Sequence, residues 1–283
     1  MRRETRFAAV LREAAAARRA VGAFTCYDLL GCEAVVRAAE ARDAPVIVLV
    51  GPASFAARGG ERLLAAFRAA AARAPVDVLV QLDHASDRSL IARAARAGVD
   101  AVLADGSRLP YAANLAFTSA VAEELRPRGI AVEAELGRVE GDEDQAAQVA
   151  GGALTDPAEA AAFTRASGVD LLAVSIGNVH GHYAGPPALD WERLERLRGG
   201  GGAPLSLHGA SGLPDADVSR AVALGIAKAN VNTELRAAYF DALGAGVVSR
   251  REALDLSGLG EAVIHAVTDV VGAKLALFGW AAR

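Results

Sequence analysis

Lysine, aromatic residues and cysteine are scarce in this chain of 283 residues. Lys228 and Lys274 are its only lysines, so a mechanism that needs a lysine amine would have to use one of two residues. Arginine cannot take that role, because its guanidinium is effectively always protonated. Since only 5% of the residues are aromatic, we expect a core packed mainly with Ala, Val and Leu. Cys26 and Cys32 are too few for a disulfide framework, which predicts reduced thiols and a cytoplasmic location.

The chain also lacks an excess of basic charge and any long apolar run. Its formal net charge is -4, whereas nucleic-acid-binding proteins usually carry a basic field. No window approaches about 18 uninterrupted apolar residues, the length that indicates a membrane span. Near the start of the chain, Glu4, Arg6 and Arg12 interrupt the apolar core that a signal peptide requires. We therefore expect neither nucleic acid nor a membrane among its partners.

Short apolar runs alternate with helical patterns along the chain. The runs are typical of parallel strands buried on both faces, and they span 20–24, 46–50, 76–82, 101–104, 131–136, 171–175, 205–208 and 227–231. Helices are expected between them, at 32–42, 60–73, 87–97, 111–126, 156–167, 187–198 and 215–224. Asp87 and Asp156 are expected to cap two helix starts, and Gly98 and Gly168 to end those helices.

Eight strands in this alternation predict a (β/α)₈ barrel, an α/β fold that a chain of this length forms as one domain. We expect that single domain to span residues 1–283 and to end in a helical segment from about residue 234. An open, doubly wound sheet is the alternative, although it would use fewer strands. The glycine run at 199–202 is interpreted as a loose loop before a strand, because a phosphate-binding loop would need a following helix.

Histidines follow several of the predicted strands. In a barrel, such side chains meet at the C-terminal face of the strands. His84, His180 and His208 follow three separate strands, and three protein ligands with an open position are typical of catalytic zinc. One histidine in such a place is more often a half-buried side chain with satisfied hydrogen bonds, but three together favour a metal site. His182 could serve as a spare ligand, and His265 is expected to be a surface or packing residue.

Two turns of small residues follow the last two strands. They read GASG at 209–212 and NVNT at 230–233. Barrels commonly bind phosphate at these two strands, through backbone N–H groups and a helix N-terminus. Ser211 and Thr233 can add hydroxyl donors. Either segment alone would be ordinary turn chemistry, but together they predict a phosphorylated ligand.

These segments together resemble the class II, metal-dependent ketose-bisphosphate aldolases, most closely the tagatose-bisphosphate and fructose-bisphosphate branch. The resemblance covers about residues 10–240 and rests on QLDHA (81–85), DGS (105–107), EAELG (133–137), IGNVHG (176–181), LHGASG (207–212) and NVNT (230–233). It implies a lyase that reversibly cleaves a ketose 1-phosphate or 1,6-bisphosphate into dihydroxyacetone phosphate and an aldehyde. It also implies a catalytic Zn²⁺, a monovalent cation (Na⁺ or K⁺) near the phosphate, and a homodimer or homotetramer.

The resemblance further implies a role for each matching residue. His84, His180 and His208 would hold Zn²⁺, while Asp105 and Glu135 match positions that take a second or displaced metal ion in some members. Asp83 would act as acid and base at the C4 hydroxyl, and Glu143 would shuttle a proton at C1. Dihydroxyacetone phosphate would be held by Gly181, Gly209, Ala210, Ser211, Asn230, Val231, Asn232 and Thr233.

The shortage of lysine agrees with metal chemistry. Cleavage beside a carbonyl leaves an enediolate, and its charge is stabilised either by a Lewis-acidic metal ion or through a lysine imine. Lys274 lies in a helical stretch near the C-terminus, and Lys228 lies early in the last predicted strand, below the expected site. Since imine-forming barrel aldolases place their lysine in the sixth strand, where this chain has none, we favour the metal.

Two segments depart from the family's pattern. Thr25 stands after the first strand where members usually have Asn, and the Asp-Pro-Arg element that supplies an arginine to the distal phosphate is not found beyond Arg236. Arg250 or Arg251 could replace that arginine, but a solvated basic pair is an equal interpretation. The aldehyde partner is therefore left open between a phosphorylated one and a non-phosphorylated or atypical one.

Three further alternatives stay open at this point. A metal-dependent hydrolase on the same barrel would usually show a His-x-His pair at the first strand, where this chain reads FTC at 24–26. A non-catalytic sugar-phosphate-binding relative is opposed by the intact Asp83 and the three histidines. The apolar stretch 263–280 could pack against a second subunit or cover the outside of the barrel.

Overall fold

The computed structural model describes residues 4–141, 148–149, 152–200 and 202–281, and eight of its strands close into a parallel barrel. The barrel strands are β1 (Val21–Thr25), β2 (Val46–Val50), β3 (Val78–Ala85), β4 (Ala101–Ala104), β5 (Ala131–Leu136), β7 (Leu171–Val174), β9 (Leu205–Leu207) and β10 (Ile226–Val231). They lie side by side in that order, and β10 closes the ring against β1. The predicted (β/α)₈ barrel is confirmed, and the open sheet is excluded.

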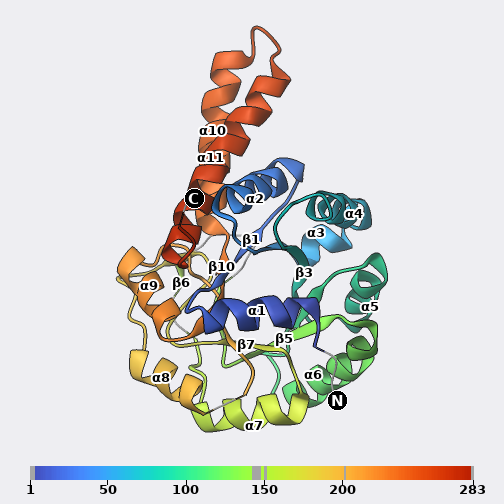
Figure 1. The fold of residues 1–283 in the computed structure, drawn as a ribbon, viewed down its shortest axis with the longest axis vertical. Helices are drawn as coiled ribbons and strands as arrows, with labels where there is room; N and C mark the ends of the chain where they lie inside the picture. Colours follow the sequence, from blue (N-terminus) through green and yellow to red (C-terminus); the bar gives the residue numbers. More distant parts are fainter. Residues whose placement is uncertain (1–3, 142–147, 150–151, 201, 282–283) are drawn as a thin grey trace.

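Helices follow the strands around the outside of the barrel (Figure 1). They are α2 (Leu29–Arg42), α3 (Pro52–Ala56), α4 (Gly60–Ala71), α5 (Arg88–Ala97), α6 (Tyr111–Leu125) with the 3₁₀ turn η1 (Arg126–Arg128), α7 (Pro157–Ser167), α8 (Trp191–Gly199) and α9 (Asp215–Ala223). Two short strands, β6 (Gln148–Val149) and β8 (His182–Tyr183), form a separate parallel pair that the sequence did not predict. Among the described residues, no helix has the length and apolar character that crossing a bilayer requires.

Most predicted boundaries agree with the structure within a residue or two, and the exceptions have local causes. Strand β3 continues three residues beyond its predicted end, to Ala85. Helix α2 begins three residues early because the Asp28 carboxylate accepts the N–H of Gly31 at 2.9 Å. Helix α8 begins four residues late, where Asp190 accepts the N–H of Arg193 at 2.9 Å. An uncapped start would leave backbone N–H groups without partners, so the capping side chain sets each start.

The interior of the barrel is apolar at its N-terminal end. Side chains alternate along each strand, so residues two apart share the inner face. Leu49, Leu79 and Ala131 lie in one buried cluster with Phe7 and Leu11 of helix α1 (Arg6–Ala16), a helix that the sequence pattern did not predict. Helix α1 therefore closes the N-terminal end of the barrel, and polar inward residues are confined to the other end.

The chain ends in a helical hairpin made of α10 (Thr233–Arg250) and α11 (Leu256–Leu277), which projects from the barrel (Figure 1). The inner half of α11 buries Val263, Val267 and Val271 and packs on α2 and α10. The stretch 263–280 thus covers the outside of its own barrel. Arg250 and Arg251 lie at the turn of the hairpin, away from the barrel, so neither completes the site of its own chain.

Candidate metal centre and substrate site

Polar side chains fill the C-terminal half of the barrel interior. Asp83 lies two residues beyond Gln81 on β3, Glu135 lies two beyond Glu133 on β5, and Asn230 lies two beyond Lys228 on β10; all six are buried. Buried polar groups are costly unless they find partners, so strands with this composition fold stably only if the side chains satisfy one another. The site is therefore a connected set of side chains.

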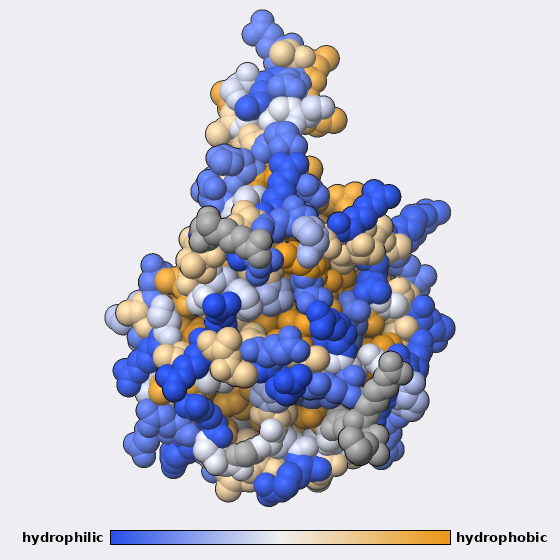
Figure 2. All heavy atoms as spheres, in the orientation of Figure 1, coloured by the Kyte–Doolittle hydropathy of each residue, from blue (hydrophilic) through white to orange (hydrophobic). Residues whose placement is uncertain are grey.

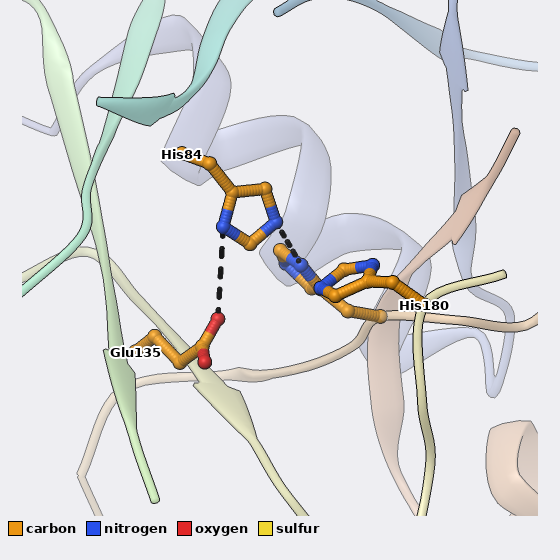
Figure 3. A group of neighbouring side chains, drawn as sticks. His84, Glu135 and His180 are labelled. Atoms are coloured by element: carbon orange, nitrogen blue, oxygen red, sulfur yellow. Dashed lines mark hydrogen bonds and ion pairs between the residues drawn. The ribbon is translucent and has the colours of Figure 1, made fainter. Parts of the chain in front are cut away.

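Four of the five predicted metal contacts converge, namely the three histidines and Glu135. One ligand atom from each of His84, Glu135, His180 and His208 lies within 4.8 Å of the others, as Figure 3 shows in part. His84 Nε2 and His208 Nδ1 are 2.9 Å apart, and the ring centroid of His84 lies 4.8 Å from that of His180. Catalytic zinc typically takes three protein ligands and leaves a position open. The donor set of this group fits such an ion.

Carboxylates hold the outer ring nitrogens of two of these histidines. His84 Nδ1 lies 2.9 Å from Asp105 Oδ2, and His208 Nε2 lies 3.0 Å from Glu133 Oε1. Carboxylates in this position fix the ring orientation and the tautomer of a ligating histidine, so the inner nitrogen keeps its lone pair for a metal. Asp105, predicted as a ligand for a second or displaced metal ion, thus lies outside the group of four and contacts one of its histidines.

The backbone at His84 adopts a left-handed conformation, with φ of 42°. The pairing of β3 with β4 shifts its register between Leu82 and Ala85, which is the signature of a bulge. A left-handed residue other than glycine costs about 1–2 kcal/mol, and such strain is found mainly at functional sites. The bulge explains why β3 outlasts its predicted end, and it turns the His84 ring toward the other two imidazoles.

Glu133 connects His208 to one of the two lysines. Its Oε2 accepts hydrogen bonds from Lys228 Nζ at 2.7 Å and from Gln81 Nε2 at 2.6 Å, and Glu133, Lys228 and His208 are all fully buried. Burial alone would raise the pKa of Glu133, but the charge of Lys228 and the hydrogen bond from His208 outweigh it and hold that pKa well below its usual range. Glu133 is therefore a buried carboxylate whose charge Lys228 balances.

Glu135 lies in the opposite electrostatic environment. Burial, and then the nearby charge of Asp105, raise its pKa above the usual value. Its Oε2 is buried and has no hydrogen-bond partner among the residues that the structure describes. A buried carboxylate oxygen that accepts no hydrogen bond is uncommon. This one lies 3.8 Å from His84 Nδ1 and within reach of the other two imidazoles, so it is a suitable ligand for a cation.

Asp83 lies beside the histidines with only 2% of its surface exposed. Its Oδ2 accepts a hydrogen bond from Asn230 Nδ2 at 3.3 Å and lies 4.0 Å from His84 Nε2. Its Oδ1 is buried without a hydrogen-bond partner in the described part of the chain. One oxygen is thus fixed by Asn230, and the other can exchange a proton with a group bound at the centre.

The predicted phosphate turns lie next to each other at β9 and β10. Ala210 N–H donates to the carbonyl of Asn230 at 3.1 Å, and Asn232 N–H donates to Ser211 Oγ at 3.1 Å. Gly209 has φ of 64°, and a Cβ there would collide with the carbonyl of Val179, so only glycine fits. Gly181 is also left-handed, Val231 is buried, and Thr233 is the first residue of α10.

The remaining candidates are dispersed. Glu143 lies outside the described residues. Thr25 is buried at the end of β1. His182 lies on β8 and is absent from the group of four, and the His265 side chain is 81% exposed and faces Asp269 on α11. Both cysteines are free and buried.

Three buried positions support the site without having been predicted for it. Glu133 holds His208, and Lys228 in turn holds Glu133. Asn178 Nδ2 donates to the carbonyl of His208 at 3.0 Å while its Oδ1 accepts the N–H of Ile176 at 2.8 Å, which ties the loop after β7 to β9. A single lysine in a strand otherwise buried on both faces requires a buried acid, and that signal was present in the sequence; the structure shows that the acid is Glu133.

Comparison with known proteins agrees with this geometry. The model of the family described as fructose-bisphosphate aldolase class-II matches residues 5–283. The chain belongs to that family. Its resemblance to solved structures of aldolases extends over almost the whole chain, and membership supports a lyase of the aldolase type.

Two crystal structures resemble this class-II aldolase at 31% identity. The YdjI aldolase from Escherichia coli K12 has a TM-score of 0.85, with 98% of each chain covered. A putative fructose-1,6-biphosphate aldolase from Coccidioides immitis has a TM-score of 0.88, with 97% of this chain and 96% of that one covered. The fructose-bisphosphate aldolase of Campylobacter jejuni, at 19% identity, a TM-score of 0.76 and coverages of 96% and 94%, shares the fold.

Proposed function

We propose that this class-II aldolase is zinc-dependent and reversibly cleaves a ketose 1-phosphate or 1,6-bisphosphate into dihydroxyacetone phosphate and an aldehyde. The observation that carries the proposal is the convergence of His84, His180 and His208 with Glu135 beside the buried carboxylate of Asp83. His84, His180 and His208 would hold the ion. When bound, it supplies Lewis-acid stabilisation of the charge that develops when the bond beside the carbonyl breaks.

The protein's own residues supply proton transfer and positioning. In the cleavage direction, Asp83 takes the proton of the C4 hydroxyl, the C3–C4 bond breaks, and its electron pair stays with the dihydroxyacetone phosphate half. In condensation, Asp83 returns that proton to the aldehyde oxygen. Asn230 keeps Asp83 in place through the 3.3 Å hydrogen bond. Glu143 remains our proposed proton carrier at C1, and Asp105 our proposed contact for a displaced metal ion.

The two turns of small residues would hold the phosphate. Residues 209–211 and 230–233, together with Gly181, would contribute the hydroxyls of Ser211 and Thr233 and backbone N–H groups other than those of Ala210 and Asn232, which already bond between the turns. A monovalent cation near the phosphate belongs to the proposal as a family expectation. A homodimer or homotetramer also belongs to the proposal as a family expectation. It is supported by apolar side chains that are exposed at the outer end of the hairpin, namely Val248, Leu254 and Leu256 (Figure 2).

Removing the metal tests the central proposal. Chelated protein should lose release of dihydroxyacetone phosphate and regain it on addition of Zn²⁺, because no lysine is placed to form an imine. His84→Asn should lose both zinc and activity, and asparagine tolerates the left-handed backbone at that position. The assay would couple dihydroxyacetone phosphate detection to a panel of fructose 1,6-bisphosphate, tagatose 1,6-bisphosphate and singly phosphorylated ketoses. Full activity in zinc-free protein would refute the proposal.

The far end of the substrate would lie in a cavity of about 590 Å³ that shares His84, Glu135 and His180 with the metal centre. The cavity extends toward the loops after β2 and β4, on the opposite side of the barrel from the phosphate turns at β9 and β10. Two arginines line it. Arg138 pairs with Glu140 at 2.9 Å, whereas exposed Arg108 has no ion pair within the described ranges. The positive charge of Arg108 supports the proposal that the aldehyde half of the substrate carries an anionic group.

Arg108→Ala should therefore separate charged from neutral aldehydes. For condensation with glyceraldehyde 3-phosphate, kcat/KM should fall on the order of tenfold, since a charge-assisted hydrogen bond is lost. With unphosphorylated glyceraldehyde the variant should match the wild type. Arg96→Ala, an exposed change on α5 outside the cavity, is the control. Equal losses with both aldehydes would contradict a role in charge recognition.

A further inference from the structure

The second lysine of the chain is also buried, and it lies behind the phosphate turn. Lys274 is 5% exposed although it belongs to α11, a helix on the outside of the barrel. Its Nζ lies 2.8 Å from Glu234 Oε2, and Glu234 is the second residue of α10. The other carboxylate oxygen, Glu234 Oε1, accepts the N–H of Gly212 at 2.8 Å. A buried cation on the C-terminal hairpin is thus connected to the turn after β9.

The Gly212 contact completes a set of bonds that fixes this turn. Gly209 accepts a hydrogen bond from the Tyr183 hydroxyl at 3.1 Å through its carbonyl oxygen, and Ser211 Oγ accepts the N–H of Asn232 at 3.1 Å. Gly212 is left-handed, with φ of 77°, so its N–H direction is not set by a regular element. Glu234 is the side chain that fixes that direction. Movement of Gly212 would displace Ser211, its neighbour in the proposed phosphate site.

A carboxylate in this position has an electrostatic cost for the proposed ligand. A phosphate held by residues 209–211 and the start of α10 would lie close to Glu234, and two anions at short range repel each other. The ammonium group of Lys274 offsets the charge of Glu234 from the side away from the turn. Because the Lys274 side chain is 7% exposed and that of Glu234 is 31% exposed, solvent screens this partly buried pair less than an exposed pair.

We propose that Lys274 is a positioning residue for substrate binding: it neutralises Glu234 so that this carboxylate can hold the Gly212 turn without repelling the substrate phosphate. The inference rests on the proposed function and extends it to a residue outside the site. It gives both lysines of the chain the same kind of task. Lys228 balances the carboxylate behind the metal centre, and Lys274 balances the carboxylate behind the phosphate turn.

Lys274→Met tests the idea because methionine keeps most of the apolar stem and removes the charge. We expect KM for the phosphorylated ketose to rise about tenfold and kcat to change less than about twofold, the size of a lost charged hydrogen bond. Affinity for dihydroxyacetone phosphate, measured by calorimetry, should fall by the same factor. The double variant Lys274→Met/Glu234→Gln should recover most of that affinity, since a neutral glutamine still accepts the N–H of Gly212.

A matched control is available at another place on the barrel. Arg68 Nη1 lies 2.6 Å from Asp100 Oδ2, and the same oxygen accepts the N–H of Val80 at 2.8 Å, so a cation, a carboxylate and a backbone N–H are again connected, here with a more exposed cation. Arg68→Met should lower the melting temperature and leave KM unchanged. If Lys274→Met behaves in the same way, or if the double variant binds no better than the single one, Lys274 is only structural and the inference is wrong. If the wild type neither binds dihydroxyacetone phosphate nor releases it from any ketose, the proposed function fails as well.

Discussion

Replacing Lys228 with methionine should lower the free energy of unfolding by about 3–5 kcal/mol, the range measured when one partner of a buried ion pair is removed. The ammonium lies 2.7 Å from Glu133 Oε2, and neither residue is exposed to solvent. The variant leaves Glu133 charged without its balancing cation, or forces it to take up a proton. Urea denaturation of the metal-free wild type and of the metal-free variant measures the difference between their free energies of unfolding. A loss below about 1 kcal/mol, the range of exposed pairs, would contradict this account of the pair.

The same change should weaken zinc binding. Glu133 fixes His208 through Nε2, and outer carboxylates of this kind typically contribute 10–100-fold to metal affinity or activity. Competition with a chromophoric chelator would measure the loss. The double variant Lys228→Met/Glu133→Gln is the informative comparison, because glutamine can still accept a hydrogen bond from His208 and carries no charge. We expect it to unfold at higher urea concentration than Lys228→Met alone.

The barrel could be predicted because its signal is local. Runs such as 46–50 and 101–104 are apolar throughout, and only strands buried on both faces require that composition. Those two strands and β5 have the predicted bounds. The Asp87 and Asp156 caps, and the left-handed Gly98 and Gly168, are confirmed for the same reason, since each acts within its own turn.

Features that depend on distant partners were harder to predict. The end of β3 depends on a bulge opposite β4, and helix α1 packs against side chains from several strands, so neither has a clear signal within its own segment. The extra pair β6 and β8 joins residues 34 positions apart, Gln148 and His182. Helix α11 illustrates the same limit: its apolar face was evident, but only the packing on α2 decides what that face covers.

The metal ligands of the site could be predicted from residue type, whereas the roles of the carboxylates follow only from distances in the structure. Histidines after three strands indicate a metal centre, because barrel strands end at one face, and the structure brings those three rings together. The roles of the carboxylates could not be read in this way. Asp105, Glu133 and Glu135 are all acidic and near the same face, yet one holds His84, one holds His208 and one completes the group of four. Only distances of a few ångströms separate these roles.

Asp83→Asn should lower kcat by about 10²–10⁴-fold, the usual contribution of a general acid and base. The change is isosteric, and the amide oxygen can still accept the hydrogen bond that Asn230 Nδ2 now donates to Asp83 Oδ2 at 3.3 Å. What it removes is the carboxylate that, in the proposed mechanism, takes the proton of the C4 hydroxyl. The neighbouring histidines are untouched, so zinc per chain should equal that of the wild type, in contrast to His84→Asn.

The combination of the two measurements separates proton transfer from metal binding. A variant that keeps its zinc and its KM but loses turnover has lost a proton acceptor. A variant that loses both zinc and turnover has lost a ligand or its support. If Asp83→Asn turns over at the wild-type rate, the proton must go elsewhere, and the buried Oδ1 of Asp83, which has no hydrogen-bond partner among the described residues, would need another explanation. If the variant instead loses its zinc, Asp83 belongs to the metal centre, and the assignment of proton transfer to Asp83 and metal binding to His84 is wrong.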